Sequence, residues 1–120
     1  MNTEDLKNRF KQFAIQVALL IRDLPKNTIN NPYCNQLIRS SSSPGANYRA
    51  ACRAKSSADF INKLKIVEEE QDESVYFLEL LLYFNPDFEP RINLLIKEGN
   101  ELVAITVASL KTARENQNRK

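Results

Sequence analysis

Four of the five prolines in this 120-residue sequence flank two polar breaks, and between the breaks hydrophobic residues recur with the period of an α-helix. Pro25 and Pro32 enclose the first break, and Pro86 and Pro90 enclose the second. The residue before a proline is driven out of the α region, whereas proline itself fits the first turn of a helix. The sequence therefore predicts helices that end at each break and begin again behind it.

Each helical segment carries a hydrophobic stripe when its residues are placed at about 100° per residue. Thr3 and Ser56 are the expected N-caps of the first and third segments, and Gln71 and Ser74 interrupt the third stripe with polar groups. The predicted core positions are Leu6, Phe10, Phe13, Ala14, Val17, Ile21 and Leu24 in the first segment, Phe60, Leu64, Val67, Val75, Leu78 and Leu82 in the third, and Ile92, Ile96, Gly99, Val103, Val107 and Leu110 in the fourth. Helices at about 4–24, 32–54, 57–84 and 89–114, with a frayed basic tail at 115–120, are typical of one all-α domain, an antiparallel up-and-down four-helix bundle.

The second segment contains the run RSSSSPGAN at 39–47, which has two interpretations. Read locally, Ser-Ser-Pro-Gly is a turn that breaks the helix. Read with its flanks, the run is a helix kinked at Pro44, whose small residues let a neighbouring helix approach closely. A phosphate-binding loop is excluded because the Gly-x-x-x-x-Gly-Lys spacing is missing.

Composition excludes several classes of protein. Hydrophobic residues make up 42% of the chain and charged residues 27%, near the averages of soluble globular proteins, so a disordered chain is excluded. The first five residues form no secretory signal, and no stretch reaches the roughly 18 uncharged apolar residues of a membrane span. We therefore expect a cytoplasmic protein with no membrane partner, in which Cys34 and Cys52 are free thiols.

The net charge of +2 conceals an uneven distribution along the chain. Residues 1–60 hold nine Lys/Arg against four Asp/Glu, which gives +5, and residues 61–90 hold two against eight, which gives −6. Residues 91–120 return to +3. Such segregation is compatible with a polyanionic partner without requiring one.

Two of the predicted helices carry hydrophobic residues on the side opposite the core stripe. These residues are Ile15 and Leu19 in the first helix and Leu94 and Ile105 in the fourth. A helix with two apolar faces needs two partners, so we expect a homo-oligomer with these residues at its interface. Asp59 and Lys63, at i and i+4 in the favourable order, either form a local surface pair or reach across a subunit boundary, and Asp59 can also serve the N-cap.

Cations gather in and after the second helix. They are Arg39, Arg49, Arg53 and Lys55, with Tyr48 among them. Their charges either pair with the acids of the third helix or bind the phosphates of RNA or DNA, in which case Tyr48 would stack on a base. We expect Arg49 and Arg53 to share one helical face.

The acids at 68–70, together with Asp72 and Glu73, invite comparison with di-iron helical bundles. Those sites need Glu-x-x-His pairs, and this chain has no histidine. Glu69, Asp72 and Glu73 also lie opposite the core stripe, so a solvated or interface face is the better interpretation. No nucleophile stands beside a recognisable base, so the sequence predicts no catalytic, cofactor-binding or metal residue, and no enzyme.

A long run in the middle of the chain resembles a known family. The segments QLIRS at 36–40, PGANYRAACRAKS at 44–56, DFINKL at 59–64, EEE at 68–70, DES at 72–74 and YFLELL at 76–81, with weaker matches at 13–14, 24–26 and 100–105, resemble the four-helix-bundle proteins encoded in 23S rRNA intervening sequences. Two residues depart from the family pattern, since Pro44 stands where Ile or Val is expected and Phe77 where Trp is expected.

The resemblance implies a bundle that assembles into a ring, a pentamer, with no assigned activity. Related bundles are accessory proteins of diversity-generating retroelements, where a basic pentamer associates with a reverse transcriptase and nucleic acid. Two hypotheses follow for this chain. It is a non-enzymatic, ring-forming scaffold, or it is a nucleic-acid-binding accessory protein that works with structured RNA or a reverse transcriptase.

Overall fold

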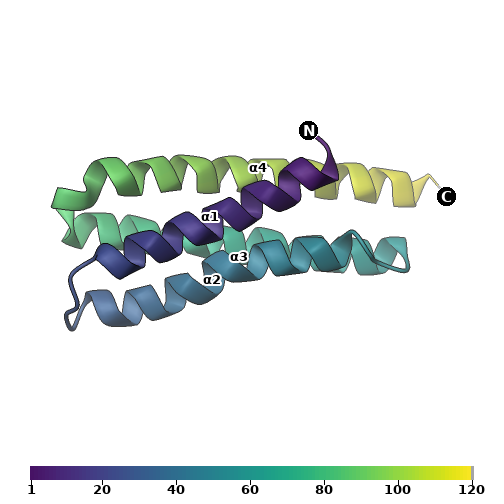
Figure 1. Cartoon of the computed structure of the whole chain (residues 1–120). Helices are drawn as coiled ribbons and strands as arrows, with labels where there is room; N and C mark the ends of the chain where they lie inside the picture. The colour runs from purple at the N-terminus through teal and green to yellow at the C-terminus, as the bar shows by residue number, and fades with distance from the viewer. Residues whose placement is uncertain (120) are drawn as a thin grey trace.

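A computed structural model of the chain describes residues 1–119, which form four long helices and a short 3-10 helix, η1 (Figure 1). The elements are α1 (Thr3–Asp23), α2 (Asn30–Ala51), α3 (Ser57–Phe84), η1 (Pro86–Phe88) and α4 (Glu89–Asn118). Both α1 and α3 pack against α2 and against α4, so the four helices occupy the corners of a square. The rod measures 52 × 21 × 21 Å, with both chain ends near one end of it (Figure 1). The predicted all-α, up-and-down bundle is confirmed.

The ends of the helices differ from the prediction by a few residues. Asn2 rather than Thr3 caps α1, because its side-chain Oδ1 accepts a hydrogen bond from the backbone N–H of Asp5 at 2.8 Å. The predicted cap of α3 is confirmed, with Ser56 Oγ accepting from the N–H of Asp59 at 3.1 Å. α2 begins at residue 30 and ends at 51, not at 32 and 54. α4 continues through 115–118, where a frayed tail was expected, and residue 120 lies outside the described residues.

α2 passes Pro44 without interruption, so the turn interpretation of this run is wrong (Figure 1). Proline has no N–H to donate to the carbonyl four residues earlier, which leaves one helical hydrogen bond unmade. The Pro44 side chain is buried, and the packing of the helix compensates for that loss. Behind it, a Cβ on Gly45 would lie 3.4 Å from Phe10 Cβ, so the small residue lets α1 approach closely.

The core follows the predicted stripes except for a rotation of α4 and smaller shifts in α1 and α3. In α1, Leu20 is buried, whereas the predicted Ala14 and Ile21 are only partly buried. In α4 the buried residues are Ile92, Leu95, Gly99, Leu102, Thr106 and Leu110, so Ile96 and Val103 are only partly buried and Val107 is 44% exposed. In α3, Ile61 and Leu81 are buried in place of Phe60 and Leu82. Apolar residues cover more than one face of α4, so periodicity alone left the direction of its inner face open.

Several polar side chains are buried in the core, among them Asn30, Ser40, Gln71, Ser74 and Asn85. Asn30 and Asn85 exchange two side-chain hydrogen bonds of 2.9 Å, which join the start of α2 to the end of α3. Ser74 Oγ donates to Ser40 Oγ at 3.1 Å between the same two helices. Gln71 is fully buried, and its Oε1 and Nε2 have no hydrogen-bond partner among residues 1–119.

No helix within residues 1–119 is both long enough and apolar enough to cross a lipid bilayer. Cys34 and Cys52 are free thiols, as predicted. Both are half-buried. Burial raises the pKa of the Cys34 thiol.

Candidate functional site

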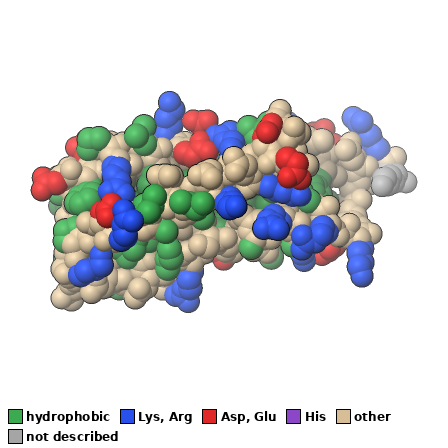
Figure 2. Space-filling model, in the orientation of Figure 1, with side chains coloured by type: hydrophobic (Ala, Val, Ile, Leu, Met, Phe, Trp, Pro, Cys, Tyr) green, Lys and Arg blue, Asp and Glu red, His purple; other side chains and the backbone are tan. Residues whose placement is uncertain are grey.

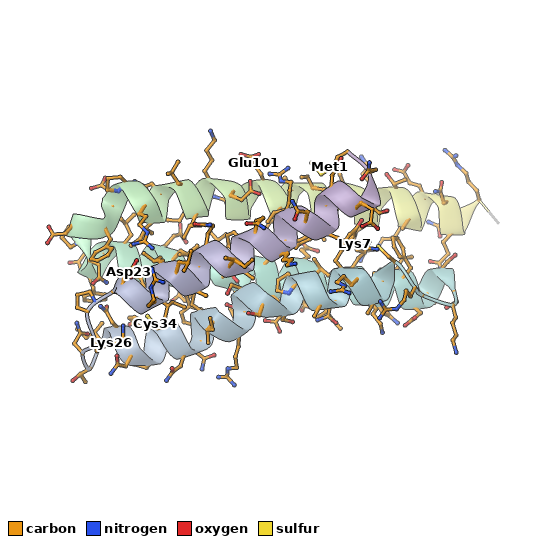
Figure 3. All side chains as sticks on the ribbon, viewed as in Figure 1. Met1, Lys7, Asp23, Lys26, Cys34 and Glu101 are labelled. Carbon is orange, nitrogen blue, oxygen red and sulfur yellow. The ribbon has the colours of Figure 1, made fainter. Side chains whose placement is uncertain are left out.

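A basic groove runs between the first half of α1 and the second half of α2. Its volume is about 500 Å³. Three cations and one acid line it, together with small, apolar and polar residues: Glu4, Lys7, Asn8, Phe10, Lys11, Ala14, Ile15, Ser42, Gly45, Ala46 and Arg49. Figure 2 shows several Lys and Arg side chains gathered where α1 begins and α2 ends, and Figure 3 shows Lys7 on the side of α1 that faces α2. Cations therefore line a depression made by small side chains.

The four cations predicted for nucleic acid are all exposed, and none makes an ion pair within residues 1–119. They are Arg39, Arg49, Arg53 and Lys55. Arg49 lines the basic groove, whereas Arg53 follows the end of α2, so the expectation that these two share a helical face is wrong.

Tyr48 does not have the role that the sequence predicted. Its side chain is 6% exposed, and its ring packs on Phe10 with 5.5 Å between the ring centroids. Burial, assisted by a hydrogen bond with Cys52, raises the pKa of Tyr48 to about 12. The ring belongs to the core and is not available for stacking on a base.

Two cations on the opposite side of the bundle, Arg9 and Arg91, are neutralised locally. Arg9 on α1 donates to Glu98 on α4, with Nε to Oε2 at 3.0 Å, and its Nη2 lies 3.2 Å from Glu101 Oε1. The hydrogen bond to Glu98 raises the pKa of Arg9. Arg91 lies 2.9 Å from Asp23, and hydrogen bonds from Arg22 and Arg91 lower the pKa of that carboxyl. Within residues 1–119, cations without an ion pair lie on α2, at Arg39 and Arg49, and also on α4, at Lys97 and Lys111.

The residues predicted for an oligomer interface fall into three groups. Ile15 and Leu94 are 39% and 70% exposed in the single chain, as residues of an oligomer interface should be before the copies assemble. Leu19 is half-buried, and Ile105 packs against the hydrophobic core, so the prediction that Ile105 points away from the core is wrong. Asp59 and Lys63 form the predicted local pair, with Oδ1 and Nζ 3.3 Å apart.

α3 carries a second row of residues on its side facing away from the core, and the sequence analysis missed it. The row, called the outer stripe below, consists of Ile66, Glu69, Glu73, Tyr76, Leu80 and Tyr83. Ile66, Tyr76 and Tyr83 are 40%, 54% and 80% exposed. The alternating spacing of three and four residues is the pattern by which one helix packs on another. That spacing was visible in the sequence, but only the inner, core-facing stripe of the same helix was assigned a role.

Aromatic side chains widen one end of the outer stripe. The Tyr33 ring of α2 lies 6.2 Å from Phe77 and 6.2 Å from Phe84, centroid to centroid. Tyr76 and Tyr83 contact these two phenylalanines edge to face. Phe77 therefore sits inside an aromatic patch shared by α2 and α3.

Acids occupy the middle of the outer stripe and its flank. Glu69, Asp72 and Glu73 are exposed, which agrees with the predicted solvated or interface face. Burial raises the pKa of Glu70, and the hydrogen bond with Glu73 and the charges of Glu73 and Glu69 raise it further. Within residues 1–119, no three His, Cys, Asp or Glu residues are grouped so that they could hold a metal ion.

These observations define a small four-helix-bundle protein whose candidate functional surfaces are exposed helix faces. The sequence model of the 23S rRNA-intervening sequence protein family matches residues 4–108, and the chain belongs to this family. A crystal structure of a protein of unknown function from the S23 ribosomal protein family of Bacteroides thetaiotaomicron is similar, with a TM-score of 0.83 and 31% identity over 92% of this chain and 99% of that one. No curated protein matches the sequence. The family predicted from residues 36–82 is thus confirmed.

Proposed function

We propose that this protein is a non-enzymatic, cytoplasmic scaffold that assembles into a closed homo-oligomeric ring, a pentamer as the family resemblance implies. The observation that carries the proposal is the outer stripe of α3. Ile66, Tyr76 and Tyr83 are exposed on a helix whose other side is already buried. Exposed apolar side chains gathered on one helix face mark interaction sites in soluble proteins, and most soluble oligomers are closed and symmetric. The exposed Ile15 and Leu94 supply further apolar surface.

Light scattering after size exclusion tests this proposal directly. One chain weighs 13.8 kDa, so a pentamer weighs about 69 kDa. A mass that stays near 13.8 kDa at micromolar concentration would remove the scaffold proposal.

A second candidate function is binding of structured RNA, or association with nucleic acid beside a reverse transcriptase as in the retroelement accessory proteins. The observation that favours it is the set of exposed cations in and after α2 that make no ion pair within residues 1–119. Arg9 and Arg91 are paired with carboxylates, whereas Arg39 and Arg49 make no ion pair within residues 1–119. Repeated around a ring, such unpaired cations form a field that attracts phosphates.

Salt dependence separates phosphate binding from other contacts. Each phosphate contact to duplex nucleic acid contributes about 0.9 to the slope of log affinity against log salt, so Arg49→Ala/Arg53→Ala should reduce that slope by about 1.8. Arg91→Ala is the matched control, since Arg91 is already paired with Asp23, and should leave the slope unchanged. Failure of wild-type protein to bind RNA or DNA at about 50 mM salt would eliminate this function.

A further inference from the structure

The basic groove and the outer stripe cannot meet within one copy of the chain. The outer stripe belongs to α3, the groove is formed by α1 and α2, and α3 does not contact α1 because the two helices stand at diagonal corners of the square. Two different patches that bind each other between copies make a head-to-tail contact. Contacts of this type repeat until they close a ring.

The two surfaces match in shape. The groove is shallow because its walls are Ala14, Gly45 and Ala46, and a helix ridge needs such a depression to seat its side chains. The outer stripe is a ridge in which Ile66 and Tyr76 project from the bundle. Ile15, an exposed apolar residue in the groove, is a suitable contact for an aromatic side chain.

Their charges match as well. Lys7 and Lys11 are four residues apart on α1, and Glu69 and Glu73 are four residues apart on α3. Four helical residues rise about 6 Å, so both carboxylates can face both ammonium groups when the helices lie side by side. Lys11 and Glu73 make no ion pair within residues 1–119, and Lys7 pairs only with the exposed Glu4 at 3.0 Å. The same complementarity appears on a larger scale, as residues 1–60 sum to +5 and residues 61–90 to −6.

The direction of the helices is compatible with a ring. α1 and α3 run the same way along the rod, because they are the first and third helices of an up-and-down bundle (Figure 1). Phe13 of α1 and Val75 of α3 both lie against Gly99, so these two residues are at about the same height along the rod. By this register Glu69 and Glu73 lie level with Lys7 and Lys11, and Tyr76 lies close to the level of Ile15. The rods of neighbouring copies then stand parallel, which is the arrangement that a ring around an axis along the rods requires.

We infer that the outer stripe of one copy docks into the basic groove of a second copy, with Glu69 and Glu73 facing Lys7 and Lys11. The inference rests on the proposed self-association and identifies its two surfaces. Crowding of the acids agrees with it, since Glu69, Glu70 and Glu73 repel one another in a single copy and cations from a neighbour would relieve that repulsion. Ile15, which the sequence predicted for an oligomer interface, then lies inside the contact between the two copies.

Charge reversal on each side, alone and together, tests the pairing. The stripe variant is Glu69→Lys/Glu73→Lys, and the groove variant is Lys7→Glu/Lys11→Glu. Each should lose the oligomer and give a light-scattering mass of 13.8 kDa, because like charges then face each other. The chain that carries all four reversals should regain the wild-type mass. Lys97→Glu/Lys111→Glu, two reversals at exposed positions of α4, is the matched control and should keep that mass.

The outcomes separate this inference from the proposed function. If the wild type is an oligomer and both reversed variants keep its mass, the docking surfaces are wrong while self-association stands. If each variant is monomeric and the chain with all four reversals stays monomeric as well, the two surfaces do not bind each other. If the groove variant loses RNA binding at unchanged mass, the groove takes phosphate and not a second copy. Circular dichroism of each variant verifies that the bundle is folded.

Discussion

Replacing Gln71 with leucine should stabilise the bundle, although the substitution is made in the middle of the core. Gln71 is fully buried in α3, and neither polar atom of its amide has a hydrogen-bond partner within residues 1–119. An amide buried in this state costs about 1–3 kcal/mol in proteins. Leucine removes that cost and fills nearly the same volume. The change from a straight to a branched side chain requires some repacking, which costs up to about 1 kcal/mol.

The net expectation is a gain of about 1–2 kcal/mol in the free energy of unfolding, or about 4–8 °C in Tm for a chain of this length. Urea unfolding followed by circular dichroism, at equal protomer concentration, measures it. Gln16→Leu on the exposed surface of α1 is the control and should change stability by less than about 0.5 kcal/mol. If Gln71→Leu instead loses more than about 1 kcal/mol, the amide is hydrogen-bonded in solution and the reasoning fails.

Three further predictions follow from close contacts and from one shifted pKa. Gly99→Ala should lower the free energy of unfolding in urea by about 1–3 kcal/mol, because the new Cβ would lie 2.8 Å from Val75 Cγ2. Gly45→Ala places its Cβ 3.4 Å from the nearest atom, so it should leave stability unchanged or raise it by up to about 1 kcal/mol. Equal effects at the two glycines would contradict the packing described here. Asn30→Ala should cost about 1–3 kcal/mol in the same assay, because it leaves the buried Asn85 Oδ1 without a donor, although Asn85 Nδ2 still donates to the Leu81 carbonyl. A loss below about 0.5 kcal/mol would count against the Asn30–Asn85 pair. Glu70→Gln should raise stability at pH 7, because the folded state raises the pKa of Glu70 and so disfavours its charge. That advantage should shrink as pH falls through the raised pKa of folded Glu70 and be lost below the ordinary glutamate pKa of about 4.3, and a constant difference across pH would refute it.

Much of the fold was predictable because it depends on local chemistry. Pro25, Pro32, Pro86 and Pro90 act on the backbone of their own neighbours, so the breaks they mark are where the chain turns. The N-cap at Ser56 was equally local. Pro44 was ambiguous because its outcome depends on burial against other helices, which outweighs the lost hydrogen bond and keeps α2 continuous.

The surfaces were harder to predict because they depend on how the helices are rotated. Tyr48 belongs to a basic run in sequence, yet its ring faces Phe10 across the α1–α2 contact. Ile105 was assigned to the outside of α4, and the rotation of that helix turned it toward the core. The spacing of the outer stripe of α3 can be read from the sequence alone. Its identification as an exposed contact surface requires knowing that the opposite side of α3 is already buried in the core, which only the packed structure shows.

The central claim is that this bundle is one unit of a larger self-assembly. Native mass spectrometry of the wild-type protein at micromolar protomer concentration counts the copies in one measurement. The account predicts a dominant species at a whole multiple of 13.8 kDa, about 69 kDa for the pentamer, that disappears in the Glu69→Lys/Glu73→Lys variant. A dominant wild-type species at 13.8 kDa would contradict it.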